Sequence, residues 1–174
     1  NGGTDSPWFN SAGPFREERG RGKGYLYEGG IRVPLIASWP GVIDPGSGST
    51  HISSFQDLLP TLCDIAGVEV PGDIDGISFL PELRGGAEQS NHPYLYWEFP
   101  ESGGQQAVRM GPWKAIRTGI RGGNLDLELY NLESDPFEEN NVADEHPELL
   151  ESFAWIMEEE RVPSEKFNFG RSTN

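Results

Sequence analysis

Glycine and proline interrupt this sequence so often that little room is left for long helices or strands. The chain holds 23 Gly and 14 Pro among 174 residues, and both residue types favour turns. Hydrophobic residues still make up 35%, with 9 Phe, 5 Trp and 5 Tyr, which is more large apolar surface than a disordered chain carries. We therefore expect a globular, loop-rich fold of one domain or two small ones.

The charge of the chain is strongly negative and gathers toward its C-terminal end. Asp and Glu number 28 against 13 Lys and Arg, a formal net charge of −15. Such a field repels phosphate backbones, so nucleic-acid binding is not expected. No apolar run approaches the ~20 residues of a membrane-spanning helix, so no membrane span is predicted. The single cysteine, Cys63, excludes an intrachain disulfide and a cysteine-based zinc site.

The first half of the chain predicts a strand and a helix after a glycine-rich loop. Residues 31–39 form a nearly continuous apolar run, which is typical of a strand buried in a parallel sheet. Apolar residues then recur at helical spacing until Gly67, a C-terminal stop signal. We place the helix start at Gln56 or Asp57, because Pro60 then falls in the first turn, where no hydrogen-bond donor is lost.

The second half predicts a small antiparallel sheet covered by a helix. Turn signals such as Gly111-Pro112 separate runs that alternate apolar with polar residues. These strand candidates are residues 92–99, 105–110, 113–118 and 125–132. From Asp144, an expected N-cap, an apolar stripe at helical spacing reaches Met157. We expect this helix to cover one face of the sheet, and we divide the chain into residues 1–88 and 89–174.

Lys23 is the strongest candidate for a charged binding residue. It stands in Arg21-Gly22-Lys23-Gly24, where flanking glycines let the backbone approach an anion closely and the lysine supplies a compact positive charge. This pattern favours a phosphate- or sulfate-like oxyanion as ligand. The triplet Gly-Lys-Gly also occurs in ordinary solvated turns, so it does not decide the matter alone.

A longer string around Lys23 is far more specific than the triplet. It runs Gly22-Lys23-Gly24-Tyr25-Leu26-Tyr27-Glu28-Gly29-Gly30-Ile31-Arg32-Val33-Pro34 and ends in Trp39-Pro40-Gly41. This string closely resembles the second signature region of the type I sulfatases, in the alkaline-phosphatase-like superfamily. The likeness continues through Asp57-Leu58-Leu59-Pro60-Thr61, Asp75-Gly76, Arg109, Gly111-Pro112-Trp113-Lys114, Leu129-Tyr130-Asn131-Leu132 and Asp135-Pro136. The chain thus resembles the C-terminal portion of the complete enzymes.

The resemblance implies a fold and an activity. The expected fold is the C-terminal part of an α/β sulfatase domain, residues 1–88, followed by a small α+β subdomain, residues 89–174. The expected activity is hydrolysis of sulfate esters of glycans or aryl groups, with a cysteine-derived formylglycine as nucleophile and a divalent cation, usually calcium. The resemblance also implies export to the periplasm or the cell exterior.

The resemblance also assigns roles to single residues. Asn1 matches the end of the family's Asp-Asn-Gly metal motif and would be a metal ligand, since an amide oxygen suits a hard cation. Lys23 would contact the sulfate and stabilise charge that develops on its oxygens or on the leaving group. Glu98, at the end of an aromatic strand, is a candidate for contact with a sugar hydroxyl of the substrate.

Two other residues are expected to be structural. Glu28 beside Arg32 favours an internal ion pair over a catalytic acid. Cys63 does not match the family's nucleophile motif Cys/Ser-x-Pro/Ala-x-Arg, because Asp64-Ile65-Ala66-Gly67 follows it, so it is expected to pack in an apolar environment. Without that motif and the remaining metal ligands, the chain by itself is expected to be inactive.

Two alternative functions stay open at this point. The first is hydrolysis of phosphate or phosphonate esters, because enzymes of the same superfamily bind those oxyanions in a similar way. The second is a non-catalytic acidic interaction module. The sequence upstream of Asn1 would separate them: a convertible cysteine in the nucleophile motif favours sulfate, a threonine favours phosphate, and a natural start codon there favours the interaction module.

Overall fold

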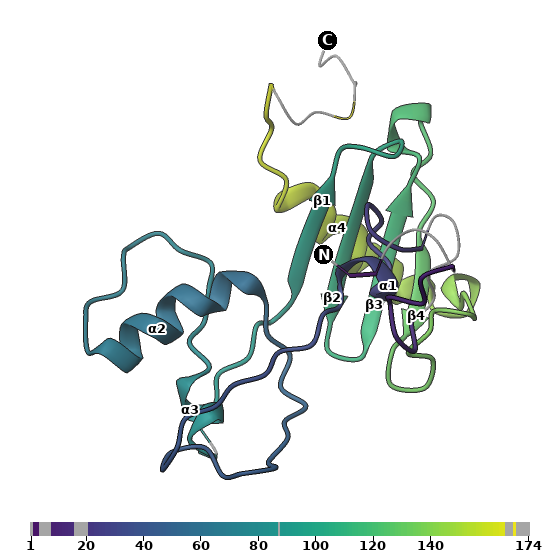
Figure 1. Ribbon diagram of the computed structural model, residues 1–174. Coiled ribbons are helices and arrows are strands. Elements are labelled where there is room, and N and C mark those ends of the chain that lie inside the picture. Colours follow the sequence, from purple (N-terminus) through teal and green to yellow (C-terminus); the bar gives the residue numbers. More distant parts are fainter. Residues whose placement is uncertain (1, 4–7, 16–20, 87, 166–168, 170–174) are drawn as a thin grey trace. The chain divides into compact units, whose positions relative to one another are not determined.

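The computed structural model describes residues 2–3, 8–15, 21–86, 88–165 and 169 (Figure 1). The chain divides into two compact units. One unit is formed by Asn1–Val33 together with Tyr94–Asn174, and the other by Pro34–Pro93. The N-terminal segment thus belongs to the same compact unit as the sheet. The division of the sequence at residue 88, which concerns membership of a catalytic domain, stays a prediction.

The first unit is built on a four-stranded antiparallel sheet in chain order (Figure 1). Its strands are β1 Leu95–Phe99, β2 Gln105–Met110, β3 Trp113–Thr118 and β4 Glu128–Asn131. Each lies inside a run predicted as a strand, so the small antiparallel sheet is confirmed. A tight turn at Gly111, with φ of 57°, joins β2 to β3. The register places Lys114 opposite Arg109 on one side and Tyr130 on the other.

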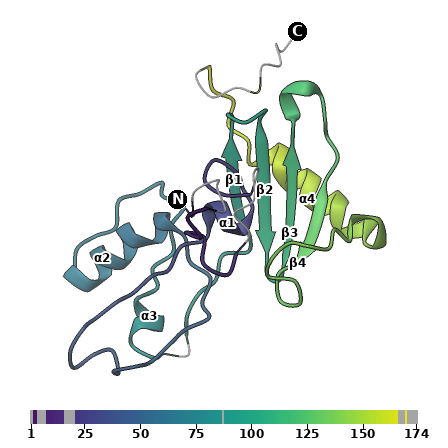
Figure 2. The same ribbon diagram turned by 45° about the vertical axis from the view of Figure 1, so that its right-hand side comes forward.

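The two faces of the sheet are covered by different parts of the chain. The helix α4, Pro147–Glu159, packs on one face, where its buried residues meet Val108, Ala115 and Leu129. The N-terminal segment packs on the other face, where Leu26 and Tyr27 meet a second apolar cluster. These two residues precede the short helix α1, Glu28–Ile31. Figure 2 shows α1 and α4 on opposite sides of the strands.

The predicted C-terminal helix is confirmed, but its expected N-cap at Asp144 is wrong. Ala143–Glu145 forms a separate 3-10 turn, η3, and α4 begins at Pro147 after His146. Proline suits the first helical position because it has no amide hydrogen to lose there, but it bars the preceding residue from helical geometry. His146 accordingly has φ −134° and ψ 57°, which separates the turn from the helix.

The second unit contains short helices joined by loops. They are η1 Phe55–Asp57, α2 Leu58–Ala66 and α3 Leu80–Leu83. The predicted late start of α2 is confirmed, with Pro60 in its first turn. Gly67 ends the helix in the left-handed conformation, φ 66°, as the stop signal predicted. Cys63 is buried on α2, as expected for a packing residue.

The predicted buried strand over residues 31–39 is wrong. The segment leaves α1 at Ile31 and forms no strand, and the side chains of Leu35 and Ile36 are 59% and 90% exposed. An apolar run signals surface that can be buried, whereas a strand also needs a hydrogen-bonded neighbour. None of the four strands of the described sheet pairs with this segment, and Pro34 lacks an amide donor within it.

Candidate sulfate-ester site

The loop that carries Lys23 is fixed by backbone contacts to the chain near residue 3. The amide of Gly2 donates to the carbonyl of Gly30 at 2.7 Å, and the amide of Gly3 donates to Gly29 at 2.9 Å. The amide of Lys23 in turn donates to the carbonyl of Gly3 at 2.6 Å. Hydrogen bonds therefore join residues 2–3, before Lys23, to residues 29–30, after it, and Lys23 itself is bonded to Gly3.

These contacts require glycine because the backbones nearly touch. A Cβ on Gly30 would lie 2.1 Å from the carbonyl oxygen of Tyr25 and 2.5 Å from that of Gly22. A Cβ on Gly2 would lie 2.2 Å from the carbonyl oxygen of Gly29. No side chain fits at such distances, so the glycines of this loop serve close packing of backbone on backbone. The side chain of Lys23 itself is exposed, and its ammonium is thus available to an anion.

Gln105 of β2 attaches the Lys23 loop to the sheet. Its side-chain oxygen accepts from the amide of Leu26 at 3.2 Å, and its side-chain nitrogen donates to the carbonyl of Gly24 at 2.9 Å. The residue is fully buried. The side-chain oxygen and nitrogen of Gln105 thus both bond to the backbone directly after Lys23.

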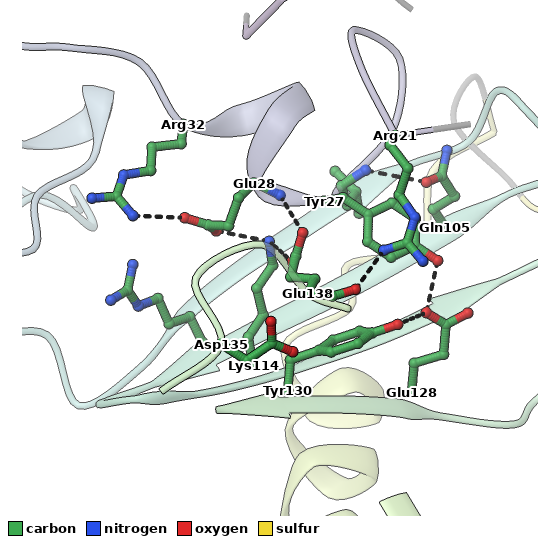
Figure 3. Close-up of polar contacts among 12 residues, drawn as sticks. Arg21, Tyr27, Glu28, Arg32, Gln105, Lys114, Glu128, Tyr130, Asp135 and Glu138 are labelled. Atoms are coloured by element: carbon green, nitrogen blue, oxygen red, sulfur yellow. Dashed lines mark hydrogen bonds and ion pairs between the residues drawn. The ribbon is translucent and has the colours of Figure 1, made fainter. Parts of the chain in front are cut away.

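A buried ion network joins the same loop to the sheet a few residues later (Figure 3). The ammonium of Lys114 on β3 lies 2.8 Å from Glu28 Oε1 and 2.8 Å from Glu138 Oε1. The other oxygen of Glu138 accepts from the amide of Glu28 at 2.7 Å. Side-chain exposure is 0% for Lys114, 4% for Glu28 and 2% for Glu138. Arg32 completes the set at 3.5 Å from Glu28.

The pKa values of the two carboxyl groups in this network are shifted in opposite directions. Burial alone raises the pKa of Glu28, but Lys114, Arg109 and Arg32 outweigh it and hold that pKa below the ordinary value. For Glu138 burial dominates, and its pKa lies above the ordinary value despite Lys114. One ammonium therefore faces two carboxylates, and the charged form of Glu28 is favoured further because Glu28 also faces two arginines.

A second set of contacts holds the loop beside this network. The guanidinium carbon of Arg21 lies 3.8 Å from the centre of the Tyr27 ring. The hydroxyls of Tyr27 and Tyr130 both donate to Glu128 Oε2, at 2.7 and 2.6 Å. Burial, followed by the nearby Glu128, raises the pKa of each tyrosine. These hydroxyls therefore remain protonated donors. The Tyr27 hydroxyl holds the chain after Lys23 to Glu128 of β4, and Arg21, before Lys23, donates to the carbonyl of Glu138 at 3.2 Å.

Comparison with known proteins identifies the family to which this chain belongs. Residues 17–160 match the family model described as N-sulphoglucosamine sulphohydrolase, C-terminal. The chain belongs to the sulfatase family. The matched range includes Lys23 and the Glu28, Arg32, Lys114 and Glu138 of the buried ion network.

Individual sulfatases share the similarity over most of this chain. A sulfatase of Formosa agariphila is 36% identical over 84% of the chain and 28% of its own length, and an ulvan-active sulfatase of the same organism is 31% identical over 83% and 36%. Human arylsulfatase A is 36% identical over 75% of the chain and 31% of its own length. The sulfatase chain thus spans about a third of these relatives.

Solved structures confirm the predicted fold class. The crystal structure of Ps i-CgsB matches with a TM-score of 0.71 and 27% identity, over 91% of this chain and 34% of that one. BT4656, solved with its substrate D-glucosamine-2-N,6-O-disulfate, matches with a TM-score of 0.56 and 30% identity, over 70% and 26%. Most of the fold of this chain therefore recurs as one part of each of these two larger structures.

Of the predicted site residues, the two that the structure describes, Lys23 and Glu98, do not lie at one place. Asn1 lies outside the described residues. Lys23 and Glu98 lie on opposite sides of the sheet, because Gln105 holds the Lys23 loop on the α1 face whereas Glu98 bonds to Tyr96 of the α4 cluster. The Glu98 carboxylate accepts from the Tyr96 hydroxyl at 2.7 Å and lies 3.4 Å from Arg161. Its predicted sugar contact stays a prediction.

Metal binding by this chain stays a prediction, and its predicted ligand, Asn1, lies outside the described residues. Within the described ranges, no three or more His, Cys, Asp or Glu side chains gather in a way that would hold a metal ion. Across the same ranges, no helix is long and apolar enough to cross a membrane.

Glu28, by contrast, has the internal ion pair that its position beside Arg32 predicted. Two closer contacts of Glu28 were missed by sequence reasoning. Lys114 forms an ion pair with its carboxylate, and Glu138 accepts a hydrogen bond from its backbone amide. A signal for Lys114 was present: in a strand, residues two apart share a face, so Lys114 shares its face with the apolar Ile116. A lysine at a core-facing position requires a buried counter-charge.

Proposed function

We propose that the protein containing this chain hydrolyses sulfate esters of glycans, and that Lys23 binds the sulfate group. The observation that carries the proposal is an exposed lysine on a loop whose backbone is fixed on both sides, in a chain of the sulfatase family. A rigid loop with one outward ammonium is suited to a tetrahedral anion, because little conformational entropy is lost when the anion binds.

The glycan class of the substrate is supported by two relatives. One is an ulvan-active sulfatase, and the other was solved with a disulfated glucosamine as substrate. Ulvan and the disulfated glucosamine are both sulfated carbohydrates. For this protein we infer a sulfated carbohydrate rather than a simple aryl sulfate, and location in the periplasm or outside the cell, where such glycans are met.

The reaction is proposed to follow the sulfatase pattern. Lys23 would stabilise negative charge that grows on the sulfate oxygens or on the leaving oxygen as the ester bond breaks. A formylglycine outside this sequence would supply the nucleophile, and calcium or another divalent cation would supply positive charge at the sulfate. Asn1 would contribute one ligand oxygen to that cation. Its sequence neighbours Gly2 and Gly3 pair with the loop of Lys23, which supports a role for both residues at one site.

Replacement of Lys23 in the natural full-length protein tests this proposal. We expect Lys23→Ala to lower kcat/KM for a sulfated glucosamine by about 10²- to 10³-fold, the effect of losing one charge-stabilising group. The melting temperature is expected to stay within about 1–2 °C, since an exposed side chain contributes little to the fold. Arg121→Ala, an exposed cation of the turn η2, Ile120–Gly122, is the matched control and is expected to retain full activity.

Two results would contradict the proposal. One is unchanged activity per folded molecule in Lys23→Ala. The other is faster hydrolysis of the matching phosphate ester than of the sulfate ester by the unaltered protein, which would assign it to phosphoryl transfer instead.

A further inference from the structure

The buried ion network lies close in sequence and in space to the loop of Lys23. Glu28 follows Lys23 by five positions and begins α1. Its carboxylate is held by Lys114 of β3, and its amide by Glu138 beyond β4 (Figure 3). Three segments that are distant in the sequence thus meet at Glu28. The start of α1 is therefore fixed at both its side chain and its backbone.

Three contacts connect Lys114 to Lys23. Lys114 binds the carboxylate of Glu28 at 2.8 Å. The next residue, Gly29, accepts from the amide of Gly3 at 2.9 Å, and Gly3 accepts from the amide of Lys23 at 2.6 Å. Every link is a hydrogen bond or an ion pair with defined direction. A shift of Glu28 relative to the sheet would therefore be passed on to the backbone of Lys23.

The charged groups of the buried ion network are better suited to positioning the loop of Lys23 than to stabilising the fold. Two buried carboxylates and one ammonium carry a desolvation cost that well-packed apolar side chains would avoid, so a buried ion pair is weak support for a purely stabilising role. Charged hydrogen bonds, however, fix direction and register, which apolar packing does less well. The loop they fix holds the only side chain to which the proposed function assigns the sulfate.

We propose that Lys114 is a positioning residue for the sulfate-ester site, because its ammonium fixes Glu28 and, through the glycine contacts, the orientation of Lys23. This inference rests on the proposed function of Lys23. Lys114 itself is fully buried and is not expected to touch substrate.

A double-mutant cycle in the natural full-length protein tests this inference. We expect Lys114→Met to lower kcat/KM per folded molecule on the order of 100-fold, as a misplacement of about 1 Å does. In the background of Lys23→Ala, the same change is expected to lower kcat/KM by less than about threefold, because the group it positions is already absent. Arg121→Met is the matched control for loss of a cation and is expected to behave additively.

A second variant covers the case in which Lys114→Met does not fold. Glu138→Gln keeps the volume and an oxygen for the amide of Glu28 but removes one charge of the network. We expect it to lower kcat/KM by about tenfold, again with little effect in the Lys23→Ala background.

The outcomes separate this inference from the proposed function. If the effects of Lys114→Met and Lys23→Ala multiply, or if Lys114→Met retains full activity per folded molecule, the positioning role is overturned and the role of Lys23 stands. If Lys23→Ala itself retains full activity, the proposed function and the positioning role fail together.

Discussion

Lys114 shows how a single charged residue can be buried completely and still be stable. Two carboxylates lie within 2.8 Å of its ammonium, so desolvation is offset by two short ionic contacts. The opposite pKa directions of Glu28 and Glu138 follow from the same geometry, because Glu28 also faces Arg32 and Arg109 while Glu138 is governed by burial. Loss of the lysine would leave two buried charges without their shared partner.

At this scale we predict opposite pH effects of the two carboxyl groups on the free energy of unfolding. The lowered pKa of Glu28 means that its stabilisation is present above the ordinary value of 4.5 and is lost as the pH falls through its folded pKa. The raised pKa of Glu138 has the opposite sign: the folded state keeps its proton longer, so stability decreases as the pH rises above 4.5.

Denaturant unfolding of the full-length protein between pH 3 and 7, on the order of nine points, measures both effects. Glu28→Gln is expected to flatten the loss of stability on the acid side of 4.5, and Glu138→Gln is expected to flatten the decrease above it. Glu133→Gln, an exposed carboxyl of the same unit, is the control. A curve for Glu138→Gln that is unchanged above 4.5 would contradict the assignment.

Among the elements, α1 and the loop of Lys23 depend on close contacts of backbone with backbone. We predict that Gly30→Ala destabilises the protein by about 1–3 kcal/mol, the usual cost of overpacking, because its Cβ would lie 2.1 Å from the carbonyl oxygen of Tyr25. Gly122→Ala is the matched control, since nothing lies within 4 Å of a Cβ there. Chemical denaturation of both variants checks this, and equal stabilities would show that the loop relaxes without cost.

The elements also show what the sequence can and cannot predict. The four strands and α4 were predictable because alternation, turn residues and a helical stripe are local signals. Residues 31–39 were misassigned because their apolar character says nothing about a pairing strand. The start of α4 was misplaced because the effect of Pro147 on His146 outweighs the capping preference of Asp144. Lys23 was predicted from its flanking glycines and the family resemblance, and its role stays a prediction. The contacts of Lys114 and Glu138 could not be predicted, because they join segments far apart in the sequence.

On the scale of the whole molecule, the chain exposes more apolar surface than its high charge suggests. The exposed side chains include Leu35, Ile36, Leu62 and Trp155, while the chain spans about a third of the relatives reported above. Where large exposed apolar groups are contiguous, they are typical of surfaces that contact other protein. The formal charge of −15 opposes self-association of such surfaces.

We predict that the 174-residue chain by itself binds a hydrophobic fluorescent dye and self-associates when salt screens its charge. Replacement of Leu35 and Ile36 together by Ser is expected to reduce dye fluorescence by about half or more, because both side chains are mostly exposed. Fluorescence titration and light scattering at low and high salt provide the measurement. Dye binding that is absent in the unaltered chain would contradict this prediction.

The meeting of α1, β3 and the turn beyond β4 at one ammonium has a consequence for recombination between related genes. A chimaera that takes residue 28 from one parent and residues 114 and 138 from another has a buried ion network whose members come from two different proteins. Crossover points placed between these positions are thus expected to yield few active hybrids, whereas exchanges that keep all three from a single parent leave the loop of Lys23 in its position on the sheet.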